Sequence, residues 1–262
     1  MRGVILAGGK ATRLRPLTYV TNKHLLPIYD RPMIYYPLQA MARSGITEVL
    51  LITGPEHAGG FLNLLRSGSR FGLRLQYDIQ EEAGGIAQAM GLAERFVDGE
   101  KIMMLLGDNI FTADLRPYLQ QFVQRPQGAM VFVTRVEDPR QCGVVELDAS
   151  GRVVSIEEKP QQPKSNLAQT GIYCYDSQVF DVIRTLAPSG RGELEVTDLN
   201  MWYVRQGLLS APELPGLWID AGTSHDELLR ANQQVAALCA SGELLRIGAV
   251  NQEPISAILH AH

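Results

Sequence analysis

The sequence of 262 residues contains little cysteine and lacks long apolar runs. Its three cysteines, Cys142, Cys174 and Cys239, lie far apart and form neither a metal-ligand pair nor a disulfide framework. We expect them to be small buried hydrophobic residues in a reduced, cytoplasmic protein. No apolar run approaches the ~20 residues that a membrane helix needs. The first residues do not resemble a secretory signal, so the sequence predicts neither membrane insertion nor export.

An excess of positive charge is also missing. The chain has 24 Lys and Arg against 28 Asp and Glu, which gives a formal net charge of -4. This balance argues against the broad basic surface that binds nucleic acid. An acidic protein can still bind an anionic ligand, but only through local basic groups or a metal ion.

The chain does contain a regular alternation of strand-like and helix-like segments in its first half. Short apolar runs typical of buried strands span residues 3–6, 48–52, 73–79, 102–106 and 129–133. Helix-like segments span residues 32–43, 61–65, 86–96 and 115–123. The alternation predicts crossover units and therefore an α/β fold. We expect a Rossmann-like, mostly parallel but mixed central sheet flanked by helices on both faces.

The second half of the chain has a more mixed pattern. Segments 143–147 and 152–157 resemble a hairpin, and residues 170–175 resemble another strand. Helices are expected at about 177–186, 195–206 and 224–239. Repeats, low-complexity tracts and long linkers are missing. We expect one domain over residues 1–262, with a nucleotide-binding half (1–125), a half that closes the cleft (126–240) and a tail (241–262).

The first strand runs directly into Gly8 and Gly9, with Arg13 and Lys23 close behind. Ligands of open α/β sheets bind beyond the carboxyl ends of the strands, and glycines let backbone N–H groups approach them. Arg13 can clamp a phosphate with two hydrogen bonds, and Lys23 can add a point charge. The stretch matches neither the P-loop nor the dinucleotide-binding pattern. Taken alone, it is either a turn with a solvated basic rim or a phosphate loop.

Two aspartates follow apolar runs that resemble buried strands. Asp108 comes after residues 102–106, and Asp220 comes after residues 217–219. Asp108 alone is also consistent with a helix cap, and Asp220 alone with a turn before Gly222. Two carboxylates that leave room for water and phosphate oxygens suit Mg²⁺.

Three further stretches carry polar residues at the ends of predicted elements. Glu158 and Lys159 end a predicted strand, where they are either an exposed charge cluster or part of a site. The acids that follow Arg191 either suit a helix N-terminus or belong to a site. Gln80 and Gly85 flank a strand–helix turn that either presents them to a base edge or is a plain connection.

Taken in order, these stretches resemble the sugar-1-phosphate nucleotidyltransferases. The resemblance rests on AGGKATRLRPLT at 7–18, KHLLPIYDRPMIYYPL at 23–38, GDNIF at 107–111, EEKP at 157–160, PKSN at 163–166, RGELE at 191–195 and WIDAGT at 218–223. It covers the chain to about residue 240 and implies the nucleotidyltransferase fold. It also implies that a sugar 1-phosphate attacks the α-phosphorus of a nucleoside triphosphate in line and releases pyrophosphate.

Within that family, the chain is most similar to the branch that uses dTTP and α-D-glucose 1-phosphate to make dTDP-glucose, an early intermediate of dTDP-sugar (for example dTDP-rhamnose) synthesis. The resemblance implies a homo-oligomer, commonly a tetramer. A uridylyl- or cytidylyltransferase for another sugar phosphate is the alternative, because one methyl group supports only ~1–3 kcal/mol of discrimination. A non-catalytic sugar-nucleotide-binding regulatory protein is a further alternative, which the presence of Arg13, Lys23, Asp108 and Asp220 disfavours.

The resemblance also implies roles for individual residues. The metal ligands for Mg²⁺ would be Asp108 and Asp220, and the catalytic residues would be Arg13, Lys23 and Asp108. The nucleotide would contact Leu6, Gly8, Gly9, Arg13, Gln80, Gly85 and Asp108, with Gln80 and Gly85 against the pyrimidine edge. The sugar phosphate would contact Asn109, Gly143, Glu158, Lys159 and Arg191.

Some positions depart from the family pattern close to the expected ligands. Lys10 and Ala11 stand where the family usually has Ser-Gly, and a Cβ at Ala11 disfavours left-handed backbone. His24 replaces a common glutamine. Cys142 and Gln169, beside the expected sugar pocket, stand where an aromatic residue and a valine are common. The tail from residue 241 matches poorly the extension that, in longer members, is linked to a regulatory nucleotide site.

Overall fold

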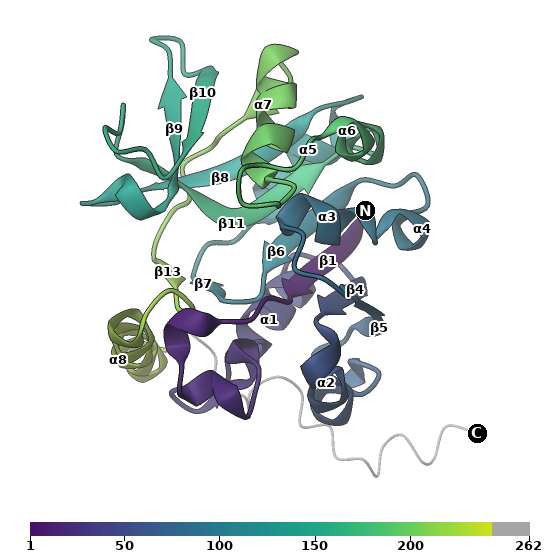
Figure 1. The fold of residues 1–262 in the computed structure, drawn as a ribbon, viewed down its shortest axis with the longest axis vertical. Helices are drawn as coiled ribbons and strands as arrows, with labels where there is room; N and C mark the ends of the chain where they lie inside the picture. Colours follow the sequence, from purple (N-terminus) through teal and green to yellow (C-terminus); the bar gives the residue numbers. More distant parts are fainter. Residues whose placement is uncertain (243–262) are drawn as a thin grey trace.

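The structure is a computed structural model that describes residues 1–242. At its centre is a nine-stranded sheet with the order β10-β9-β11-β6-β1-β4-β5, and β8 and β12 extend it beside β11 (Figure 1). The strands are β1 (Arg2–Ala7), β4 (Glu48–Thr53), β5 (Arg74–Ile79), β6 (Ile102–Leu106), β8 (Ala129–Arg135), β9 (Gly143–Leu147), β10 (Val153–Glu158), β11 (Leu167–Tyr175) and β12 (Leu209–Ser210).

The strand directions confirm a mostly parallel, mixed sheet. Strands β4, β1 and β6 are paired in parallel, and β5 continues this arrangement beside β4. Strand β11 is antiparallel to β6, β8 and β9, and the β9–β10 hairpin is antiparallel. Within the described residues, only β10 and β11 therefore run against the common direction of the sheet. Because β11 pairs with β6, one continuous sheet joins the two halves of the chain.

Helices cover both faces of the sheet, as the apolar strands predict (Figure 1). One face packs against α1 (Tyr35–Arg43), α2 (Ala58–Leu65) and α5 (Arg116–Gln124). The other packs against α3 (Ile86–Gly91), α4 (Glu94–Val97), α6 (Val179–Thr185) and α7 (Val196–Arg205). Alternate residues of β1 serve the two cores: Ile5 belongs to the first and Val4 to the second.

Short elements complete the fold at the carboxyl edge of the sheet. Strand β7 (Asn109–Phe111) pairs with β13 (Trp218–Asp220), and α8 (His225–Ser241) packs beside β13 (Figure 1). Strands β2 (Pro27–Ile28) and β3 (Arg31–Pro32) form a small ribbon. Single 3-10 turns are η1 (Thr12–Leu14), η2 (Leu17–Tyr19), η3 (Lys23–Leu25), η4 (Pro55–His57), η5 (Ser69–Phe71) and η6 (Pro139–Gln141).

The predicted strands and most predicted helices are confirmed, with two boundary errors. The helix expected over 32–43 begins at Tyr35, because Arg31 and Pro32 form β3. The helix expected over 86–96 is divided into α3 and α4, with a tight turn after Gly91, a residue of low helix propensity. The proposed tail from residue 243 onward lies outside the described residues. None of the helices in residues 1–242 has the length and hydropathy needed to cross a bilayer.

Candidate active site

The loop after β1 forms one wall of the site. Gly9 has a φ of 90° and Ala11 a φ of 45°, so both residues are left-handed. The loop holds Ala11 in this conformation despite its Cβ, at a cost of about 1–2 kcal/mol. The Thr18 hydroxyl donates a hydrogen bond of 2.9 Å to the Ala11 carbonyl, which ties the loop to η2. Ala11 therefore adopts the left-handed conformation that glycine adopts without a Cβ penalty.

A buried ion pair lies at the carboxyl edge of β6. The Lys23 ammonium is 2.5 Å from Asp108 Oδ2, and Asn109 Nδ2 donates a hydrogen bond of 3.1 Å to Asp108 Oδ1. Although burial opposes ionisation of both groups, the charge of Lys23 lowers the pKa of Asp108, and the charge of Asp108 raises the pKa of Lys23. Both side chains are therefore charged at neutral pH.

Asp220 reaches the same place from the other half of the chain. The β7–β13 ribbon sets Asp220 opposite Asn109, and the Ala221 N–H donates a 3.1 Å hydrogen bond to the Asp108 carbonyl. Burial, together with the nearby charge of Asp108, raises the pKa of Asp220 to about 7. The structure thus brings together Lys23, Asp108 and Asp220, which the sequence places far apart.

The two carboxylates fit a divalent cation. Two carboxylates share this place with one ammonium, and a hard cation that binds oxygen would favour the ionised form of both. No group of three or more His, Cys, Asp and Glu residues that would hold a metal occurs within residues 1–242. The candidate oxygen ligands at this place are therefore the two carboxylates of Asp108 and Asp220, and a hard cation such as Mg²⁺ commonly takes its other ligands from water and phosphate oxygens.

Gly222 makes this cluster possible, and the sequence reasoning assigned it no such role. A Cβ at Gly222 would collide with Asp108 Oδ2 and lie 2.7 Å from the Lys23 nitrogen. Only a residue without a side chain lets the chain pass this close to the ion pair. The signal was available in the sequence, because Gly222 follows Asp220 by two residues.

A pocket of about 220 Å³ opens beside the ion pair. Lys23 lines it, together with six of the seven residues predicted to bind nucleotide: Leu6, Gly8, Gly9, Gln80, Gly85 and Asp108. The seventh, Arg13, is exposed and makes no ion pair among the residues that the structure describes. His24 and Glu193 also line the pocket and were not predicted.

Contacts across the pocket fix Gln80 and Gly85. Gln80 Nε2 donates hydrogen bonds to the Gly85 carbonyl at 3.1 Å and to Gln88 Oε1 at 2.6 Å. Gly85 has a φ of 97°, and a Cβ there would lie 2.5 Å from the Leu194 carbonyl oxygen. The Leu194 N–H donates to the Gly84 carbonyl at 2.8 Å. The turn at Gly84 and Gly85 is therefore packed against the loop that carries Arg191.

His24 is a buried, neutral side chain close to the ion pair. Burial and the charge of Lys23 lower the pKa of His24 to about 3. Its Nδ1 lies 2.7 Å from Asn22 Oδ1, and Asn22 Nδ2 donates a 3.1 Å hydrogen bond to the Ala7 carbonyl. Because the Asn22 oxygen accepts, the proton of His24 is assigned to Nδ1. The histidine adds no competing charge beside Lys23.

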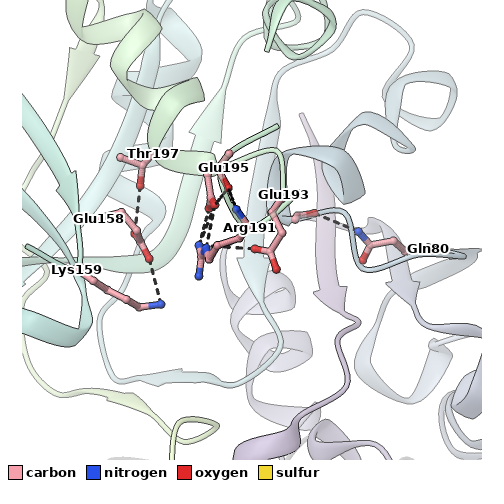
Figure 2. Close-up of polar contacts among 9 residues, drawn as sticks. Gln80, Glu158, Lys159, Arg191, Glu193, Glu195 and Thr197 are labelled. Carbon is pink, nitrogen blue, oxygen red and sulfur yellow. Dashed lines mark hydrogen bonds and ion pairs between the residues drawn. The ribbon is translucent and has the colours of Figure 1, made fainter. Parts of the chain in front are cut away.

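The basic residues predicted for the sugar phosphate lie in a second cluster, shown in Figure 2. Arg191 Nη2 is 2.8 Å from Glu195 Oε2 and 3.7 Å from Glu193 Oε2. Lys159 is 3.3 Å from Glu158 Oε1, and the other oxygen of Glu158 accepts a 3.2 Å hydrogen bond from Thr197. Each base is thus paired with an acid of its own sequence motif.

Of two other predicted sugar contacts, Asn109 lies beside the first cluster and Gly143 beside the second. Asn109 is buried, and its Oδ1 accepts hydrogen bonds from the Gly171 N–H at 2.8 Å and from Trp218 Nε1 at 2.6 Å. Its amide therefore joins β7 to β11 and β13. Gly143 lies opposite Glu158 in the β9–β10 hairpin, and a Cβ on it would lie 3.6 Å from Gln169 Cβ.

Comparison with known proteins gives matches over most of the chain. A model of the nucleotidyl transferase family matches residues 2–237. A glucose-1-phosphate thymidylyltransferase from an Actinoplanes strain is 46% identical over 255 residues, which are 96% of this chain and 83% of the relative. One from Neisseria gonorrhoeae is 47% identical over 226 residues, which are 85% of this chain and 78% of the relative.

Solved structures show the same architecture. A Bacillus anthracis protein that carries the name glucose-1-phosphate thymidylyltransferase superposes with a TM-score of 0.85 at 49% identity, over 89% of this chain and 94% of that one. A UDP-glucose pyrophosphorylase in complex with UDP-glucose superposes with a TM-score of 0.79 at 22% identity, over 90% of this chain and 98% of that one. The second likeness establishes the fold alone.

Proposed function

The chain belongs to the nucleotidyl transferase family and, within it, to the glucose-1-phosphate thymidylyltransferases, and on this premise we propose its reaction and the roles of its residues. The reaction transfers the thymidylyl group of dTTP to α-D-glucose 1-phosphate and yields dTDP-glucose and pyrophosphate. The observation that carries the assignment of roles is the cluster of Lys23, Asp108 and Asp220 at the mouth of a pocket that also contains Gln80 and Gly85.

The chemistry requires positioning and charge neutralisation rather than a covalent intermediate. An oxygen of the sugar phosphate forms a bond to the α-phosphorus, and the bond from that phosphorus to the bridging oxygen of pyrophosphate breaks. The attacking phosphate is largely a dianion at neutral pH, because its second pKa is about 6. It therefore needs no general base, and the site needs no Ser or Cys nucleophile.

Lys23 and Arg13 supply the positive charge at the reacting phosphates. Lys23 is held by Asp108 and points its ammonium into the pocket, where it meets the α-phosphate. Arg13, on the glycine loop, faces the β- and γ-phosphates and neutralises the charge of the departing pyrophosphate. Mg²⁺, when held by Asp108 and Asp220, supplies further charge neutralisation at the α-phosphate.

Arg191 and Lys159 hold the phosphate of the sugar substrate on the opposite side of the site. Glu195 and Glu158 are their ion-pair partners before the substrate arrives. We assign the sugar hydroxyls to Glu158, Asn109 and Gly143. The reacting oxygen is then held between this second cluster and the α-phosphate.

The test is pyrophosphate release over a grid of nucleoside triphosphates and sugar 1-phosphates, with and without Mg²⁺. We expect the highest kcat/KM with dTTP and glucose 1-phosphate, and loss of turnover when a chelator removes the metal. Preferred turnover with UTP or CTP and another sugar phosphate would contradict the substrate assignment. The assignment to the nucleotidyltransferase reaction would still hold. No turnover with any pair would contradict catalysis itself.

We also propose the oligomeric state of the protein and the compartment in which it works. We expect a homo-oligomer, commonly a tetramer, that works in the cytoplasm and binds neither nucleic acid nor membranes. Light scattering of the purified protein measures the mass of the particle. A monomer in solution at micromolar concentration would contradict the expected assembly.

A further inference from the structure

A second pocket is lined in part by the loop after β1. Its volume is about 440 Å³, and we call it the loop pocket. It is lined chiefly by Lys10, Arg15, Tyr19, Asn22, Glu56 and His57. It shares only Gly9 with the nucleotide pocket, so the backbone at the end of β1 separates the two. The volume falls in the range of roughly 300–1,000 Å³ that is typical of small-molecule sites.

The charges that line the loop pocket are available to a ligand. Lys10 and Arg15 are exposed, and the ion pairs found within residues 1–242 include neither of them. Arg191, Lys159 and Arg116 are by contrast each paired with a carboxylate. Glu56 is the one acidic residue that lines the loop pocket. It forms no ion pair with Lys10 or Arg15.

Several contacts keep the walls of the loop pocket in shape. The bond from Thr18 to the Ala11 carbonyl fixes the loop to η2, and the bond from Asn22 to the Ala7 carbonyl fixes η3 to the end of β1. The Arg15 guanidinium carbon lies 5.2 Å from the centre of the Tyr19 ring, which holds the arginine against η2. The pocket is therefore largely preformed, which lowers the entropic cost of binding.

We propose that the loop pocket is an anion site that takes up inorganic pyrophosphate. Two unpaired cations and an imidazole match an anion with several negative charges. The inference rests on the proposed function for the source of the ligand: pyrophosphate leaves the neighbouring pocket and passes to the far side of Gly9.

Equilibrium dialysis with radiolabelled pyrophosphate at fixed salt tests the proposal. We expect the wild-type protein to bind two pyrophosphates per chain, and the Lys10→Gln/Arg15→Gln double variant to bind one. The double variant Arg95→Gln/Arg205→Gln removes two exposed, unpaired arginines on α4 and α7 and should bind two. Lys10→Arg keeps the charge and should also bind two, so a shape effect of Lys10 is separated from its charge.

Saturating dTTP, added without a sugar phosphate, distinguishes the two pockets. We expect one pyrophosphate per chain to remain on the wild-type protein and none on the Lys10→Gln/Arg15→Gln variant, with at least a tenfold loss of affinity at that site. Equal counts on the wild-type protein and the Lys10→Gln/Arg15→Gln variant, or a wild-type count that dTTP reduces to zero, would overturn the proposal. Turnover with dTTP is measured in a separate assay. If the proposed reaction fails there, the number of pyrophosphates bound per chain without nucleotide still tests the loop pocket, because it compares the wild-type protein with the Lys10→Gln/Arg15→Gln variant.

Discussion

The ion pairs of the two clusters of basic residues differ in how deeply they are buried. On the nucleotide side, the Lys23 side chain is 19% exposed and its partner Asp108 10% exposed. On the sugar side, the Arg191 side chain is 50% exposed although it is paired with Glu195. A buried pair is costly to break, whereas an exposed pair contributes ~0–1 kcal/mol. If the proposed roles hold, the reacting centre is fixed in advance, while Arg191 can exchange its carboxylate partner for the phosphate of the sugar substrate.

The largest effect is expected from Asp108→Asn. This change removes a metal ligand and the partner of Lys23 while keeping the size of the side chain. Turnover should fall by at least ~10²–10³-fold, the scale for loss of one group that stabilises a transition state. Steady-state kinetics with varied Mg²⁺ measures it, and Asp114→Asn, which alters an exposed pair with Arg116, is the matched control. A near-wild-type rate would remove Asp108 from the reacting centre.

A somewhat smaller effect is expected from Gly222→Ala. The new methyl group meets the Asp108 carboxylate and the Lys23 ammonium, so one of them has to move. A displacement of about 1 Å can cost on the order of 10²-fold in rate. The control is Gly59→Ala in α2, where a Cβ meets nothing within 4 Å. Equal kinetics for the two alanine variants would show that the ion pair tolerates movement.

Arg191→Gln tests the exposed side of the comparison. We expect KM for glucose 1-phosphate to rise about tenfold, the equivalent of ~1.4 kcal/mol, with kcat changed less and KM for dTTP unchanged. The free energy of unfolding should change by less than ~0.5 kcal/mol, because the pair with Glu195 is exposed. Arg184→Gln, which breaks an exposed pair on α6, is the control. A rise in KM for dTTP instead would place Arg191 on the nucleotide.

The smallest effect is expected from Ala11→Gly. Glycine adopts the left-handed conformation of residue 11 without a Cβ penalty, but it also gains freedom in the unfolded chain. We expect the free energy of unfolding to rise by no more than ~1 kcal/mol. Urea denaturation measures the change, and Ala113→Gly, whose φ is not positive, should destabilise the protein instead. Destabilisation by Ala11→Gly would mean that the loop is not strained.

The sequence predicted the parts of the site that directly follow strand-length apolar runs. Gly8, Gly9 and Asp108 follow buried strands, and the carboxyl edge of a parallel sheet brings them together. The meeting of Asp220 with Asp108 could not be derived this way. It depends on β7 and β13, each of three residues, whose pairing across more than a hundred residues leaves no periodic signal.

The pairing of the basic residues was also beyond sequence reasoning. The motif around Arg191 shows three charges in five residues, but only the loop backbone decides that Glu195 turns back onto the guanidinium. The same holds for Asn109, which was predicted to meet sugar hydroxyls. Its amide is also bound to Asp108, Gly171 and Trp218, and these contacts depend on three different elements.

The backbone bonds that join Gly84 and Ala87 to Leu194 have a thermodynamic consequence. They tie the turn at Gly85 to the loop that carries Arg191, two segments that we propose bind different substrates. Under that proposal, a shift of one segment on binding would change the strain in the other and link the affinities for the two substrates. Linkage is reciprocal: whatever factor the nucleotide applies to sugar phosphate affinity, the sugar phosphate returns.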